Sequence, residues 1–333
     1  MSFASMRFIP AFGVLAILLH PVFFVIYRLS VFNTVPRDDY AGFLLWLLRQ
    51  PGGAAPDSPY GYRVLSMAAA APFYYGLPAV PLTNTPAALT GPYLQATAAL
   101  SMVAFLAWVA AAMLGYAAAV RAGLSRAEAA MAGALVFVLM PYVQITAIDP
   151  LAVALIAAGV CLVDRRWPFA ALLAVSVITN EKVALVLGCW LVTRCALSRE
   201  DRAALGWQAL ASVLAIGCYL AMVMLVSLPG NTYQVEPGHY PATLRDNVAA
   251  YATARGLLLN VLPIVVLAGM AVLGRPTGVF RRRDALVIPA LAAVALVLTQ
   301  YFQAGRIVMH AAPLFAPPAA KALSGWLDRR RSG

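Results

Sequence analysis

Few side chains in this sequence can perform acid–base chemistry, and most of them stand at the edges of apolar segments. Asp38 and Asp39 directly follow the first apolar run. A carboxylate beside an apolar surface can have a raised pKa and accept a proton from a hydroxyl group. An Asp before a helix can equally cap free backbone N–H groups. Both roles stay open, and we expect one of the pair to be a catalytic general base.

A second group of polar residues is suited to binding an anion such as a phosphate. Arg306 and His310 stand four residues apart, which places them on one helical face. Arginine binds phosphate through charge-assisted hydrogen bonds, although it also anchors helices at lipid headgroups. The turn at 180–182 provides ligands, forms a local ion pair between Glu181 and Lys182, or is a simple solvated turn. The expected substrate- or phosphate-binding residues are Arg63, Tyr62, Asn180, Glu181, Lys182, Arg306 and His310.

Other polar residues fit structural roles better. Asp149 precedes Pro150, which favours helix initiation. His20 is expected to be a packed core histidine, and His239 to lie on a loop surface. The four cysteines all lie in apolar runs and indicate buried small hydrophobic residues. The outer carboxylates are compatible with a divalent metal, but the sequence shows no ligand set and no definite cofactor.

The composition predicts that a membrane surrounds most of this chain. Of its 333 residues, 62% are hydrophobic and 11% are charged, against about 25% charged in soluble domains. The net charge of +11 comes mostly from arginine in short loops between apolar runs, which indicates membrane topology rather than nucleic-acid binding. P-loop, HExxH and Rossmann glycine patterns are absent, which disfavours nucleotide hydrolysis and zinc-protease chemistry.

The apolar runs predict an all-α, polytopic transmembrane helix bundle of about ten spans, formed by residues 1–333 as a single domain. Three expected spans are shorter than the usual length of about 20 residues. The first span of the chain, 8–32, is expected to be retained rather than cleaved as a signal peptide. The expected spans are 8–32, 93–120, 128–147, 150–163, 167–179, 183–198, 205–228, 256–273, 285–302 and 307–325.

The segment 61–80 is apolar enough to span, and the charge distribution decides against it. If it does not cross, two thirds of the 24 basic residues fall on the cytoplasmic side with both termini, as the positive-inside rule requires. We therefore expect 39–50 and 61–80 to be interfacial helices in a first outer loop at 33–92. A second outer loop is expected at 229–255.

These features resemble the GT-C class of membrane glycosyltransferases and its uncharacterised bacterial relatives. The similar segments are PRDDY at 36–40, PYGYRVL at 59–65, NEK at 180–182 and GRIVMHAAPLFAPP at 305–318. Architecturally, the resemblance covers most of the chain. The chain is short for the class, and its motifs are brief.

The resemblance implies that a sugar moves from a polyprenyl-phosphate carrier to a periplasmic or lipid-linked acceptor, at the outer face of the bacterial inner membrane. Asp38 or Asp39 would activate the acceptor hydroxyl, and the basic residues would neutralise the departing lipid phosphate. The expected partners are the lipid-linked sugar and membrane lipid, with no nucleic acid. Three other classes stay open: a transporter or flippase of a lipid-linked or amphipathic solute, another membrane transferase of the O-antigen polymerase or acyltransferase type, and a non-catalytic assembly subunit.

Overall fold

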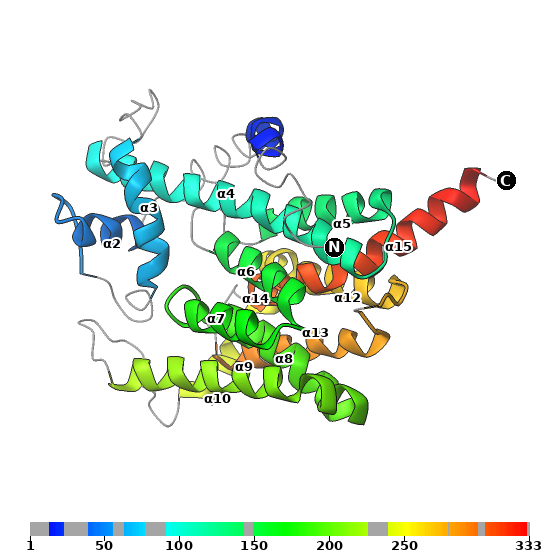
Figure 1. Ribbon diagram of the computed structural model, residues 1–333. Helices are drawn as coiled ribbons and strands as arrows, with labels where there is room; N and C mark the ends of the chain where they lie inside the picture. Colours follow the sequence, from blue (N-terminus) through cyan, green and yellow to red (C-terminus); the bar gives the residue numbers. More distant parts are fainter. Residues whose placement is uncertain are drawn as a thin grey trace.

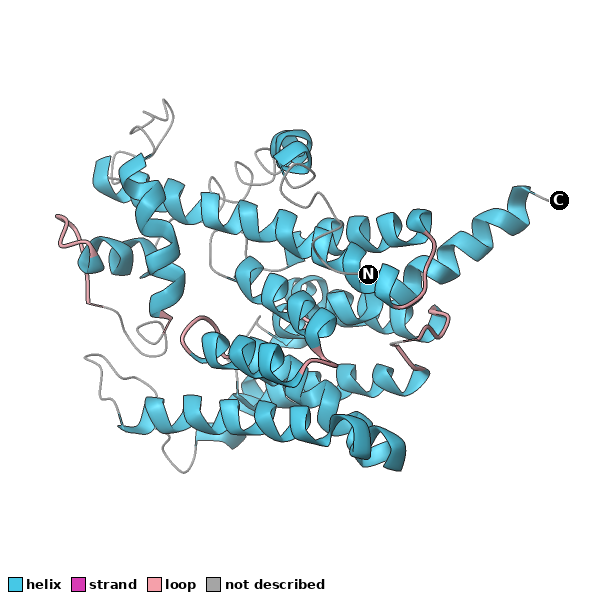
Figure 2. Ribbon diagram, in the orientation of Figure 1, coloured by secondary structure: helices cyan, strands magenta, loops and turns pink. Residues whose placement is uncertain are grey.

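The computed structural model describes most of the chain as helices. The described residues are 13–22, 39–55, 63–76, 91–142, 149–225, 239–278, 280–298 and 304–331. Within these ranges there are helices, turns and short irregular segments, and no strand (Figure 2). The expected all-α fold is confirmed.

Each expected span that is described contains a helix. The bounds are α4 Gly91–Arg121, α5 Arg126–Leu139, α6 Asp149–Leu162, α7 Arg166–Val177, α8 Lys182–Leu197, α9 Arg199–Leu225, α12 Leu262–Leu273, α13 Val287–Leu298, α14 Ala304–Met309 and α15 Ala312–Arg331. Short turns η3 Met140–Tyr142 and η5 Arg282–Leu286 precede α6 and α13. Within the expected second outer loop, His239–Tyr251 forms the helix α10.

Three helices in the described part of the chain are long and apolar enough to cross a membrane. They are α4, α9 and the continuous segment Ala254–Leu273, which consists of α11 Ala254–Gly256, the π-helical turn η4 Leu257–Val261, and α12. Large apolar side chains of α9, including Met224 and Leu225, are exposed as a lipid-facing surface would be. These helices indicate a membrane protein, and the expected number of about ten spans stays a prediction.

Small residues allow the central helices to pack closely. A Cβ atom at Gly133 of α5 would lie 2.7 Å from the carbonyl oxygen of Ala112 in α4. A Cβ atom at Gly159 of α6 would lie 2.6 Å from the side chain of Leu187 in α8. Glycine at such crossings lets helix backbones approach closely. This close packing stabilises helix association in a membrane, where water provides no hydrophobic driving force. These contacts build the core from which the polar residues project.

The helices α2 (Asp39–Leu47) and α3 (Val64–Gly76) pack together on the first half of α4. Figure 1 shows α3 running across the direction of α4. The Leu65 N–H donates to the Ile178 carbonyl at 3.2 Å, and Gln95 in the first turns of α4 donates to the Tyr74 carbonyl. Both ends of α3 therefore lie on the side of the bundle where α4 and α8 begin, which is the arrangement expected of a helix that does not cross.

The opposite side of the bundle, which we call the Arg194 end, holds its own ion pairs. Arg194 donates two hydrogen bonds of 2.7 Å to Asp284, and both side chains are buried. Arg281 pairs with Asp201 at 2.8 Å. These contacts join α8, α9 and η5 on the side where α8 ends and α9 begins.

The first expected span, 8–32, is described only over its helix Gly13–Val22. Figure 1 views this helix nearly end-on, whereas α4 runs across the picture. His20 lies on its exposed side and contacts Phe105 edge-on, with ring centroids 5.6 Å apart. The expectation of a packed core histidine at this position was wrong, because the helix lies on the outside of the bundle.

Candidate functional site

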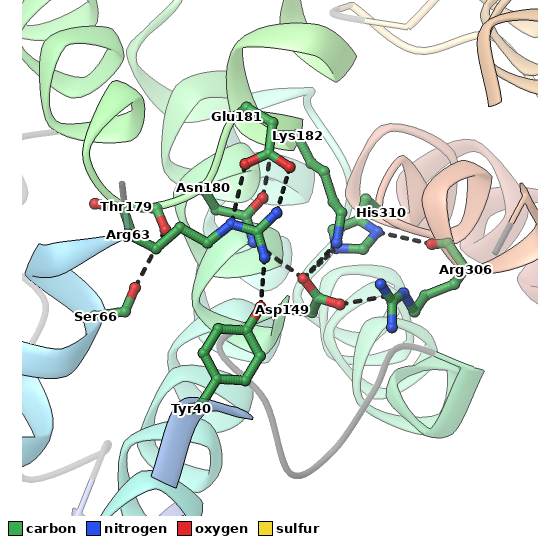
Figure 3. A network of polar contacts seen from close by, with 10 residues as sticks. All are labelled: Tyr40, Arg63, Ser66, Asp149, Thr179, Asn180, Glu181, Lys182, Arg306 and His310. Atoms are coloured by element: carbon green, nitrogen blue, oxygen red, sulfur yellow. Dashed lines mark hydrogen bonds and ion pairs between the residues drawn. The ribbon is translucent and has the colours of Figure 1, made fainter. Parts of the chain in front are cut away.

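A buried carboxylate, Asp149, lies at the centre of a polar cluster (Figure 3), on the side of the bundle where α6 and α8 begin. Its Oδ1 atom accepts hydrogen bonds from Lys182 Nζ at 2.7 Å and from Asn180 Nδ2 at 3.0 Å. Arg306 Nε lies 3.3 Å from its Oδ2 atom. His310 Nε2 lies 3.7 Å from Oδ1, which is longer than a hydrogen bond. We call these five residues the Asp149 cluster.

The helix termini position this cluster. Asp149 begins α6, and Lys182 begins α8. Asn180, in the turn before α8, accepts a hydrogen bond from the Lys182 N–H at 3.1 Å while its amide group donates to Asp149. Asn180 thus satisfies one of the free N–H groups that every helix start leaves, and it ties the starts of α6 and α8 together.

A second polar unit, Arg63 with Glu181 and Tyr40, adjoins the cluster. Arg63 Nε donates to Glu181 Oε2 at 3.1 Å, and a second hydrogen bond runs from its Nη2 to Oε1. Its Nη1 donates to the Tyr40 hydroxyl. Arg63 precedes α3, so its two-pronged ion pair with Glu181 holds α3 at the turn at 180–182. Tyr40 belongs to α2, so its hydrogen bond with Arg63 joins α2 to the same turn.

A break between α14 and α15 presents Arg306 and His310 to Asp149. His310 lies in this break and is fully buried. Its Nδ1 lies 2.7 Å from the Arg306 carbonyl oxygen. A carbonyl oxygen only accepts, so Nδ1 carries a proton and Nε2 faces Asp149. The expected common face of these two residues is therefore present, although the helix does not continue through position 310.

Burial and neighbouring charges act against each other in this cluster. Burial alone would raise the pKa of Asp149, but the positive charges of Lys182 and Arg306 hold it well below its usual range. Burial lowers the pKa of Lys182 to about 8, despite the nearby Asp149. Burial would also raise the pKa of Glu181, and Arg63 with Lys182 outweighs that effect and lowers it.

The cluster and the adjoining unit together carry an excess of positive charge. Arg63, Lys182 and Arg306 provide three cationic groups, and Asp149 and Glu181 provide two carboxylates. The Arg306 side chain is 22% exposed, whereas that of Lys182 is 6% exposed. Of the three cationic groups, Arg306 is therefore the most accessible to an anion, which the surplus positive charge would favour.

The structure brings together six of the nine site residues expected from the sequence: Arg63, Asn180, Glu181, Lys182, Arg306 and His310. Asp38 and Tyr62 lie outside the described residues. Asp39 begins α2, but its side chain also lies outside them, as does that of His239 at the start of α10. The general-base role of Asp38 or Asp39 stays a prediction.

Sequence reasoning missed the role of two residues. Asp149 does begin a helix, as expected, but it also accepts hydrogen bonds from the side chains of Asn180, in the turn before α8, and Lys182, at the start of α8. Tyr40 was not expected to bind Arg63. The alternative of a local ion pair between Glu181 and Lys182 was wrong: Glu181 pairs with Arg63, and Lys182 pairs with Asp149.

Among the described residues, no group of three or more His, Cys, Asp or Glu side chains is placed to hold a metal ion. No family model, curated protein or solved structure matches this chain.

Proposed function

We propose that this chain is a GT-C-like membrane glycosyltransferase that moves a sugar from a polyprenyl-phosphate carrier to a periplasmic or lipid-linked acceptor. The observation that carries the proposal is the contact between Arg63 and the Tyr40 hydroxyl. Tyr40 directly follows Asp39, so this contact holds the start of α2 beside a cluster with surplus positive charge. A carboxylate base and a phosphate site would then lie within reach of one another.

The proposed topology places about ten spans in the bacterial inner membrane, with the Asp149 cluster on the periplasmic side. The helices from α4 to α9 alternate in direction between the Asp149 cluster and the Arg194 end. The Arg194 end includes the basic run at 281–283, which the positive-inside rule assigns to the cytoplasm with both termini. The crosswise α3 supports this assignment, because its two ends lie on one side.

The proposed reaction exchanges one bond at the sugar. The acceptor oxygen attacks the anomeric carbon while the bond from that carbon to the carrier phosphate oxygen breaks. The acceptor proton passes to the carboxylate of Asp38 or Asp39, and polyprenyl phosphate leaves with the bonding electrons. Arg306, backed by Lys182, would stabilise the charge that develops on the leaving phosphate, which is usually a large contribution to catalysis.

The test is sugar transfer from a polyprenyl-phosphate-linked donor by the reconstituted protein. Asp38→Asn and Asp39→Asn should both insert and fold, and at least one should lose transfer, because an amide cannot accept the acceptor proton. Asp246→Asn serves as the control, since this exposed residue lies on α10 and pairs with its neighbour Arg245 at 3.7 Å. Full activity in both variants would overturn the general-base assignment.

The same assay separates two of the other classes of protein. A flippase would move the lipid-linked donor between leaflets with its sugar bond intact, so no free polyprenyl phosphate would appear. An acyltransferase or polymerase would leave the polyprenyl-phosphate monosaccharide unchanged. Release of polyprenyl phosphate in step with product formation supports the glycosyltransferase.

A further inference from the structure

A buried polar contact joins two segments of the membrane domain beside the Asp149 cluster. Asn260 lies within Ala254–Leu273, whose composition is otherwise strongly apolar, and its side chain is fully buried. Its Oδ1 atom accepts a hydrogen bond of 3.2 Å from the Gly305 N–H. A buried amide in a candidate span is costly and is expected to have a specific role.

The local backbone around Asn260 is a π-helical turn. The Leu262 N–H donates to the Leu257 carbonyl five residues earlier, where an α-helix would bond across four. Such turns insert an extra residue, and they occur frequently at functional sites. Here the turn accompanies the inward placement of Asn260, while Leu257 and Leu258 are exposed on the same turn.

Gly305 meets this turn at a contact that no other residue can make. A Cβ atom at Gly305 would lie 2.2 Å from the Leu259 carbonyl oxygen and 2.7 Å from the Asn260 Cα atom. Both are rigid backbone atoms, so a larger residue would push the start of α14 away from η4. The absence of a side chain at Gly305 therefore fixes the separation between the two segments.

We propose that Asn260 and Gly305 are positioning residues that set Arg306 against Asp149. Arg306 follows Gly305 directly, and its Nε lies 3.3 Å from Asp149 Oδ2. The hydrogen bond from Gly305 fixes the rotation of α14, and the close backbone contact fixes its distance. That Arg306 then serves a departing phosphate rests on the proposed function, whereas the positioning itself does not.

The two lysines of the chain allow a direct test in the full-length protein. Lysine labelled with ¹³C at Cε gives one NMR signal for Lys182 and one for Lys321, and the second is an internal reference for the same titration. Arg306 lowers the pKa of Lys182 through its charge, after the larger effect of burial. Arg306→Gln should therefore raise the midpoint of the Lys182 titration. The size of this rise is the reference for the other variants.

Asn260→Ala and Gly305→Ala should each raise the Lys182 midpoint by at least half of the rise seen in Arg306→Gln. Two matched variants should leave it unchanged. Asn247→Ala removes a buried amide of α10 that donates to the Leu296 carbonyl of α13 at 2.8 Å. Gly269→Ala adds a methyl group with no atom within 4 Å. A general loss of packing would affect the test variants and the matched variants alike. Displacement of Arg306 would change the Lys182 midpoint in the test variants alone.

A folded Asn260→Ala protein with the wild-type Lys182 midpoint would overturn the proposal, as would an unchanged midpoint in Arg306→Gln. If Gly305→Ala does not fold, Asn260→Ala decides, because it removes the acceptor of the Gly305 N–H without adding any atom to the contact. The titration requires no sugar donor. Its failure is therefore distinguishable from failure of the glycosyltransferase proposal, which is decided by sugar transfer.

Discussion

Lys182 and Asp149 form an ion pair of 2.7 Å in which the two side chains are only 6% and 2% exposed. Glu181, the residue before Lys182, instead binds Arg63. One turn between α7 and α8 thus connects to α6 through Lys182 and to α3 through Glu181. The cluster at this side of the bundle depends on both connections.

Removing the carboxylate at position 149 should cost far more stability than removing an exposed one. Asp149→Asn leaves Lys182 and Arg306 without their shared counter-charge, and breaking a buried pair in this way costs about 3–5 kcal/mol. Asp164→Asn is the control, because Asp164 pairs with Arg121 at the surface with a 62% exposed side chain, where ion pairs contribute about 0–1 kcal/mol. Unfolding in mixed detergent micelles measures both, and equal losses would contradict the buried cluster.

Phosphate binding should weaken as the pH rises through about 8, because Lys182 loses its charge there. The folded-state pKa lies below the unfolded value of about 10.4, so between these pH values the unfolded state binds more protons. The free energy of unfolding should consequently rise across this window, while anion affinity falls. Isothermal titration with polyprenyl phosphate from pH 7 to pH 9.5 measures the affinity.

The control for this pH dependence is Lys182→Arg, since arginine keeps its charge throughout the range. Its affinity should stay level between pH 7 and pH 9.5. If the variant shows the same decline as the wild-type protein, another group is responsible and the role assigned to Lys182 is wrong.

Loss of the Tyr40 hydroxyl should impair transfer rather than folding. Tyr40→Phe leaves the ring packed but removes the acceptor for Arg63, a hydrogen bond to a charged group worth about 1.5–3 kcal/mol. The start of α2, and with it Asp39, should move, which reduces kcat by about tenfold to a hundredfold. Steady-state kinetics with a lipid-linked donor measures this.

Tyr75→Phe is the matched control, because Tyr75 is 66% exposed and contacts Tyr74 through its ring. It should keep the wild-type kcat. A Tyr40→Phe enzyme with unchanged kcat would show that the contact with Arg63 does not place the catalytic segment.

Opposite sides of the bundle should be labelled from opposite sides of the membrane. Ala55, in the loop after α2, and Arg282, at the Arg194 end, are both exposed. In a background without the four native cysteines, Ala55→Cys should react with an impermeant maleimide in intact cells. Arg282→Cys should react only after permeabilisation, and its labelling in intact cells would reverse the proposed topology.

Much of the helical framework follows from the sequence because long apolar runs leave few alternatives. The runs at 93–120 and 205–228 correspond to α4 and α9, and the short run at 150–163 corresponds to α6. The number of crossings does not follow, since helices of 12 to 16 residues such as α7 and α8 are compatible with both partial and full crossing. Length alone cannot decide between them.

The cluster could be predicted only where position along the chain limits the partners. Lys182, Arg306 and His310 stand at the edges of apolar runs, so topology brings them to one side. The role of Asp149 could not be predicted in the same way, because a helix-starting Asp before Pro150 has a sufficient local explanation. Its partners come from α8 and α14, and long-range packing selects them.

The most direct test of the phosphate site compares two lipids that differ only in their charged group. The purified protein in lipid nanodiscs should bind undecaprenyl phosphate in clear preference to undecaprenol, and Arg306→Gln should lose most of that preference. Equal binding of the two lipids by the wild-type protein would contradict the assignment of the Asp149 cluster to the carrier phosphate.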